Sequence, residues 1–173
     1  MITVPHTLKN FNLYIAKPGV DQASYAGLIT ELTLPKLSIK TEEFRAGGMD
    51  ASIPIEVGME SLRCDFSLAE YNIATLNLFS FFDYATSLTF RGAFTNGEAV
   101  QATVIKLNGA IKENDFGSWK LGSLVTFKVS FVATYYELTI NDKEIIKIDV
   151  VNMERVINGN DQLANWKTAI FGG

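Results

Sequence analysis

Few residues of this 173-residue chain could do chemistry. His6 is the single histidine, and no cysteine lies near it in the sequence, so neither a metal site nor a catalytic triad is indicated. Cys64 is the single cysteine and shares one face of a predicted strand with Leu62 and Phe66, where a cysteine behaves as a small hydrophobic residue. A nucleophilic cysteine would need a histidine beside it, and the sequence places none there.

The remaining candidate motifs also lack partners. Glu42 and Glu43 could imitate the carboxylate pair of a glycosidase, but adjacent carboxylates on a loop usually form a solvated edge. Gly47-Gly48 and Gly172-Gly173 match neither a phosphate loop nor a dinucleotide fingerprint. We therefore expect no active site, no cofactor and no metal, and we do not expect an enzyme.

Composition narrows the class of protein. Hydrophobic residues make up 47% of the chain and charged residues 20%, which is typical of a folded soluble protein, and the length fits one domain. The net charge of −4 argues against a nucleic-acid-binding protein, which normally has a basic stripe, but not against DNA that passes without binding. We find neither a signal peptide nor an apolar run near the ~20 residues of a membrane helix, and expect a protein made in a cytoplasm. Trp119 and Trp166 are interpreted as packing residues.

Alternation of apolar and polar residues is the dominant pattern, and it predicts β-strands. The clearest example is residues 62–68, which read as a half-buried strand. Further strands are predicted at 11–15, 28–39 with an interruption at Pro35, 88–94, 100–107, 125–140 and 146–150. The run at 125–140 exceeds the ~3–10 residues of most strands, so it either bends across two sheets or reaches toward another molecule. The fold class predicted is mainly β, a barrel or sandwich.

Helical patterns are short. Residues 73–82 carry an apolar residue at every third position up to Phe82, behind Asn72, which is placed to cap a helix. This spacing predicts one amphipathic helix of roughly three turns. A weaker helical pattern covers residues 161–170.

Residues 41–52 are the least regular part of the sequence. Gly47-Gly48 supplies a turn that tolerates positive φ, and the apolar Phe44 and Met49 flank it where an exposed tip is expected. Two interpretations stay open. The segment is either a surface loop that folds back over its own core, or an arm whose apolar tip is buried by a partner subunit.

Several segments in fixed order carry a family resemblance. The run begins with residues 7–14 (TLKNFNLY) and 31–37 (ELTLPKL), and continues through 40–51 (KTEEFRAGGMDA), 58–60 (GME) and 66–71 (FSLAEY). It resembles the major tail tube protein family of P2-like contractile phages and R-type pyocins. Beyond residue 72 the resemblance lies in length and strand order.

The resemblance implies a tail-tube fold, a β-barrel or sandwich with one flanking α-helix, similar to the type VI secretion tube protein. It implies that residues 1–173 form a single tail-tube domain, with a β-hairpin arm at about residues 41–57 that reaches a neighbouring subunit and the adjacent ring. Homohexameric rings of the family stack into a hollow tube. The interface residues implied are Glu42, Glu43, Phe44, Arg45, Gly47, Gly48, Met49 and Asp50.

The partners implied are further copies of the chain, the tail sheath protein, the baseplate or tube initiator, and a tape measure protein in the lumen. In a phage the lumen would conduct DNA without specific binding, and in an R-type bacteriocin the tube would act as an envelope-piercing needle. The implied location is a virion tail or bacteriocin particle, assembled in the bacterial host cytoplasm. Two alternatives stay open: a type VI secretion-type tube, and a monomeric lipocalin-like ligand-binding barrel, which would need an internal apolar cavity.

Overall fold

The regular structure of the protein consists mainly of antiparallel strands, and the computed structural model describes residues 4–80 and 84–172. The strands are β1 (Thr7–Lys17), β2 (Val20–Ser24), β3 (Ile29–Thr33), β4 (Ile39–Phe44), β5 (Ile53–Met59), β6 (Leu62–Leu68), β7 (Thr86–Thr95), β8 (Val100–Asp115), β9 (Phe127–Ile140), β10 (Lys143–Asp149), β11 (Glu154–Ile157) and β12 (Asn160–Asp161). The helices are α1 (Ile73–Leu76) and α2 (Ala164–Phe171). The predicted fold class, mainly β, is confirmed.

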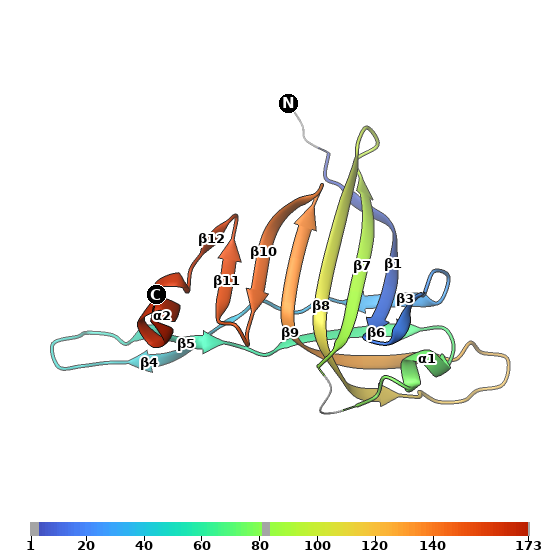
Figure 1. The fold of residues 1–173 in the computed structure, drawn as a ribbon, viewed down its shortest axis with the longest axis horizontal. Coiled ribbons are helices and arrows are strands. Elements are labelled where there is room, and N and C mark those ends of the chain that lie inside the picture. Colours follow the sequence, from blue (N-terminus) through green and yellow to red (C-terminus); the bar gives the residue numbers. More distant parts are fainter. Residues whose placement is uncertain (1–3, 81–83, 173) are drawn as a thin grey trace.

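One long strand joins two layers. The larger layer runs in the order β12-β11-β10-β9-β8-β7-β1-β2, while β3 and β6 attach to the first half of β9 (Figure 1). β9 pairs with β6 from Phe127 to Ala133, and then with β10 from Tyr135 to Ile140. The strand predicted to be too long for one sheet therefore passes from one layer into the other, as the first of the two interpretations requires.

A close approach of two backbones marks the crossing. β8 pairs with β9 along almost its whole length, but its register shifts between Asn108 and Gly109. A Cβ atom on Gly109 would lie 2.0 Å from the carbonyl oxygen of Val132. Only glycine fits at this point, and bulges of this kind bend and twist a strand.

The core lies between the two layers. Alternate residues of the strands point into it, and Leu13, Leu62, Phe66, Leu107 and Phe131 are each no more than 1% exposed. Full burial of such a side chain stabilises a fold by about 1.5–3 kcal/mol. The strand predicted at 62–68 is β6, with its apolar face buried as the alternation indicates.

Helix α1 is much shorter than the spacing predicts. Asn72 caps it as expected, since its side-chain oxygen accepts a hydrogen bond from the Thr75 backbone N–H at 3.2 Å. The helix ends after one turn, so the prediction of three turns is wrong, and Phe82 lies outside the described residues. The helix contacts the body of the protein through a polar residue rather than through an apolar stripe. Thr75 is buried and donates a hydrogen bond to the Tyr25 hydroxyl at 2.8 Å, whereas Ile73 is largely exposed.

The other elements agree with the sequence to different degrees. α2 occupies the second predicted helical segment. Residues 34–38 have no regular structure. The strand predicted to resume after Pro35 therefore begins only at Ile39, the first residue of β4. The short strands β2, β11 and β12 carry too few alternating residues to be predicted from a periodic pattern.

Candidate subunit interface

β4 and β5 form a separate two-stranded sheet that projects from the body of the molecule (Figure 1). Every residue of β4 and the first five residues of β5 are exposed. We call residues 39–59 the arm. This exposure excludes a loop that folds back over its own core. A lone hairpin is marginally stable in water, so contacts outside the hairpin are needed to hold it in one conformation.

The pairing register gives the arm two different faces. Phe44 pairs with Ile53, and Glu42 with Ile55, so these four side chains share one face. The opposite face carries polar residues, because Glu43 pairs with Pro54 and Thr41 with Glu56. The three apolar side chains of the first face, with Val57 beside them on β5, are 44–49% exposed. We call Phe44, Ile53, Ile55 and Val57 the apolar face of the arm.

The tip of the arm is held by its own hydrogen bonds. The Met49 N–H donates to the Ala46 carbonyl, and Arg45 Nε donates to the Met49 carbonyl, each at 3.2 Å. Gly48 has a φ of +87°, a conformation that glycine adopts without strain. Met49 is half-buried against the tip, so Phe44 rather than Met49 presents apolar surface there.

A partly buried ion pair fixes the base of the arm to the body. Arg155 on β11 is 8% exposed, and its Nη2 donates to Glu56 Oε1 at 2.6 Å. Asp161 binds the backbone of this arginine. Its Oδ1 accepts hydrogen bonds from the backbone N–H groups of Arg155 at 3.2 Å and Leu163 at 3.0 Å. One short network therefore sets both the direction of the arm and the start of α2.

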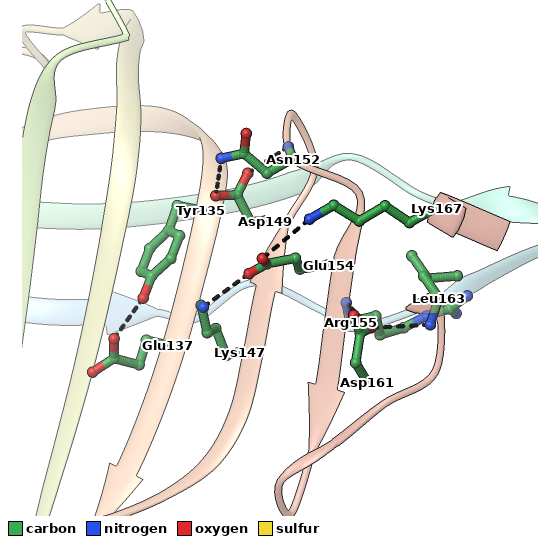
Figure 2. A network of polar contacts seen from close by, with 10 residues as sticks. All are labelled: Tyr135, Glu137, Lys147, Asp149, Asn152, Glu154, Arg155, Asp161, Leu163 and Lys167. Carbon is green, nitrogen blue, oxygen red and sulfur yellow. Dashed lines mark hydrogen bonds and ion pairs between the residues drawn. The ribbon is translucent and has the colours of Figure 1, made fainter. Parts of the chain in front are cut away.

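The same network continues across the outer face of the sheet. Figure 2 shows Glu154 between Lys147 on β10, at 2.8 Å, and Lys167 on α2, at 3.4 Å. Hydrogen bonds from these two lysines lower the pKa of Glu154. Backbone hydrogen bonds from Leu163 and Arg155 likewise lower the pKa of Asp161. At neutral pH both carboxylates are therefore ionised and bound to their partners.

A second pair lies further along the sheet. Lys106 on β8 forms an ion pair with Glu137 on β9 at 2.8 Å. Figure 2 shows the hydroxyl of Tyr135 donating to the same carboxylate. Burial alone would raise the pKa of Glu137, but these hydrogen bonds outweigh it and the pKa is lowered. Burial and the hydrogen bond to Glu137 raise the pKa of Tyr135. Each of these three lysines, Lys106, Lys147 and Lys167, is therefore bound to a carboxylate of its own chain.

The residues considered for chemistry do not form a catalytic site. Cys64 is fully buried, and burial raises the pKa of its thiol to about 12, so it carries no thiolate at neutral pH. His6 lies in the exposed segment before β1. Within residues 4–80 and 84–172, no group of three or more His, Cys, Asp or Glu side chains could hold a metal ion. Neither helix of this part of the chain is long and apolar enough to span a membrane.

The sequence located the tip of the arm but missed three of the four residues of its apolar face. The eight residues expected at an interface all lie on β4 or at the tip. Ile53, Ile55 and Val57 were missed, although they alternate with Pro54 and Glu56 and could have been found by that pattern. The two tryptophans, expected to pack, are both largely exposed.

Together these features define a class of protein. A β-rich subunit with an exposed apolar arm, held in position by polar networks, is typical of a protein that binds other protein molecules. Residues 5–170 match the family described as phage tail tube protein FII, and the chain belongs to that family.

Curated relatives support the same assignment. The chain is 32% identical to the tail tube protein of Escherichia phage P2, over 98% of this chain and 99% of that protein. It is 27% identical to the major tail tube protein of Serratia phage KSP20, over 87% of this chain and 86% of that one. The resemblance stated from the sequence is confirmed. So is the prediction that the protein is not an enzyme, because the relatives are structural tail tube proteins.

Solved structures share the fold at low sequence identity. A chain from the sheath-tube complex of the extracellular contractile injection system PVC, in its extended state, superposes with a TM-score of 0.57 at 10% identity, covering 78% of this chain and 91% of that one. A chain from the cap of the anti-feeding prophage gives 0.56 at 13% identity, covering 82% and 95%. This family and fold decide against the lipocalin-like alternative.

Proposed function

We propose that the protein forms the inner tube of a contractile tail by stacking homohexameric rings of itself, with the arm as the contact that joins neighbouring subunits and adjacent rings. The observation that carries this proposal is the arm: its apolar face is 44–49% exposed in the lone subunit. An apolar face of this kind on a projecting hairpin is stabilised when another molecule covers it.

Unpaired strand edges support the same proposal. The large sheet ends in β2 on one side and in the two-residue strand β12 on the other, and β3 pairs with β6 alone. Edge strands expose backbone N–H and C=O groups that can pair with another chain. Closing several subunits into a ring satisfies such edges, and a stacking contact that does not close on itself propagates as a filament.

The proposed mechanism is mechanical rather than chemical. The tail sheath protein surrounds the tube, the baseplate or a tube initiator starts it, and a tape measure protein occupies its lumen. When the sheath shortens, the tube is driven through the target envelope as a rigid needle. The named curated relatives come from phages, and this favours a lumen that conducts DNA over a bacteriocin needle. The net charge of −4 suits DNA passage without binding.

The assembly site proposed is a virion tail that is put together in the host cytoplasm. A bacteriocin particle is the second candidate within the same proposal. Electron micrographs of particles purified with this protein separate the two. Tails attached to filled capsids support the phage, whereas sheathed tubes without capsids support the bacteriocin.

One pair of variants tests the role of the arm. Phe44→Lys places a charge on the apolar face, and Glu43→Lys places the same side chain on the opposite face of the same strand, across from Pro54. Both positions are exposed in the free subunit, so both variants should keep the wild-type circular dichroism spectrum and thermal midpoint. Negative-stain microscopy should show tubes for Glu43→Lys and none for Phe44→Lys. Normal tubes from Phe44→Lys would remove the arm from the proposal.

A further inference from the structure

A groove lies where the arm meets the body. Arm residues 56–59, the β10–β11 turn and the first part of α2 line a space of about 670 Å³. This is within the range of about 300–1,000 Å³ found for sites that enclose a sizeable group. Its walls are largely apolar, formed by Val57, Met59, Ile148, Leu163 and Trp166 among others.

A buried arginine forms part of the wall of this groove. Arg155 lines the groove and is 8% exposed, and Glu56 accepts a hydrogen bond from its Nη2. Its Nε is buried and finds no hydrogen-bond acceptor among the described residues. A buried donor without an acceptor lowers stability, and such a group calls for an explanation. Because the Nε atom itself is buried, an incoming chain would reach this guanidinium only at its small exposed part.

Among the described residues, the three most exposed large apolar side chains lie in one loop at the opposite end of the molecule. Between β8 and β9, residues 116–126 form a loop that lies at the far right of Figure 1, while the arm and α2 lie at the left. Trp119, Leu121 and Leu124 of this loop are 83%, 102% and 87% exposed. Lys120 is the only charged residue of this loop.

Charge favours a match between the two ends. Three carboxylates line the groove, those of Glu56, Asp149 and Glu154. Glu56 is already paired with Arg155, and Glu154 with two lysines of its own chain. Asp149 accepts hydrogen bonds from Asn152 but makes no ion pair among the described residues, so it is available to an incoming cation. The loop brings a single cation, Lys120, and no acidic residue. Opposite charges at the rim of a contact steer association and select its register.

We propose that the groove between the arm base and α2 receives the 116–126 loop of a second copy of this chain. Leu121 and Leu124 would enter the apolar groove, while Trp119 keeps the hydrogen bond from its Nε1 to the Tyr71 hydroxyl of its own subunit at 2.7 Å. Because the two surfaces lie at opposite ends of one subunit, the contact is head-to-tail and repeats from copy to copy. This inference rests on the proposed self-assembly and names a contact pair for it.

Cysteine cross-linking tests the contact directly. The native Cys64 is buried and its pKa is raised to about 12, so the unaltered chain offers no reactive thiol. Leu121→Cys and Trp166→Cys each place a thiol at an exposed position, in the loop and at the groove. Val100→Cys is the matched control, because Val100 is also exposed but lies at the start of β8, away from both surfaces.

Single variants are mixed in pairs under assembly conditions, oxidised, and separated without reductant. The expected result is a mixed disulfide dimer from Leu121→Cys with Trp166→Cys, at least tenfold more abundant than the product of Leu121→Cys with Val100→Cys. The double variant should give a ladder of higher multimers. Leu121→Asp, at a position fully exposed in the free subunit, should raise the concentration needed for assembly by about tenfold to a hundredfold.

Failure of this inference is distinct from failure of the proposed function. Tubes in the micrographs together with equal or absent cross-linking would overturn the groove–loop contact and leave the tube proposal standing. Absence of any self-association by wild-type protein, at any concentration and with sheath and baseplate present, would overturn both.

Discussion

The β6 strand and the β5 strand follow the same sequence pattern, but the apolar face of β6 is buried and that of β5 is exposed. Both alternate apolar with polar residues, yet the apolar side of β6 is at most 1% exposed and that of β5, residues 53–57, is 44–49% exposed. The difference teaches that alternation identifies an apolar face but not the molecule that covers it. In β6 the cover is the chain's own β-layer, and in the arm we propose that it is another copy.

The largest effect expected from this comparison concerns stability. Phe66→Ala in β6 removes a buried ring and should lower the free energy of unfolding by about 3–5 kcal/mol. Phe44→Ala in the arm removes a half-exposed ring and should change it by less than about 0.5 kcal/mol, while weakening assembly. Urea denaturation of the dilute, unassembled subunit measures both values. Similar losses for the two variants would mean that the arm belongs to the core.

An intermediate effect is expected where the arm joins the body. Glu56→Ala deprives the buried Arg155 of its carboxylate and should destabilise the subunit by about 1–3 kcal/mol, the range for a buried donor that loses its partner. Glu43→Ala, on the same polar face but without an ion pair among the described residues, is the control and should change stability by less than about 0.5 kcal/mol. Denaturant titrations again provide the values. Equal stability of the two variants would show that the ion pair does not fix the arm.

The smallest effect is a pH dependence. The pKa of Glu154 is lowered from its ordinary value of 4.5 in the folded protein, so the unfolded chain binds a proton more readily. The stability that Glu154 contributes is fully present above pH 4.5 and is lost as the pH falls below it. Because this carboxylate is solvent-accessible, the contribution is small. Glu154→Gln should therefore flatten the fall in thermal midpoint below pH 4.5, and an unchanged pH profile would remove Glu154 from the network.

Much of the fold could be predicted from local pattern, and the exceptions have physical causes. The buried face of β6 and the passage of β9 between two layers follow from side-chain period and strand length. The length of α1 did not follow, because a hydrogen bond between Thr75 and Tyr25, fifty residues apart, docks it instead of an apolar stripe. No local pattern reports such a contact.

The candidate interface was predictable in part for the same reason. Phe44 and the Gly47-Gly48 turn are local features and marked the arm tip in the sequence. The groove between the arm base and α2 depends on Arg155 meeting Glu56 across 99 positions of sequence, which spacing alone does not reveal. The exposure of the 116–126 loop likewise depends on how its flanking strands β8 and β9 are placed.

Hydrogen–deuterium exchange, compared between the free subunit and assembled tubes, tests the central claim most directly. If other copies cover the arm, amide exchange in residues 39–59 should slow strongly on assembly, while exchange in β6 stays slow in both states. Exchange in the arm that is equally fast in tubes and in the free subunit would contradict the account.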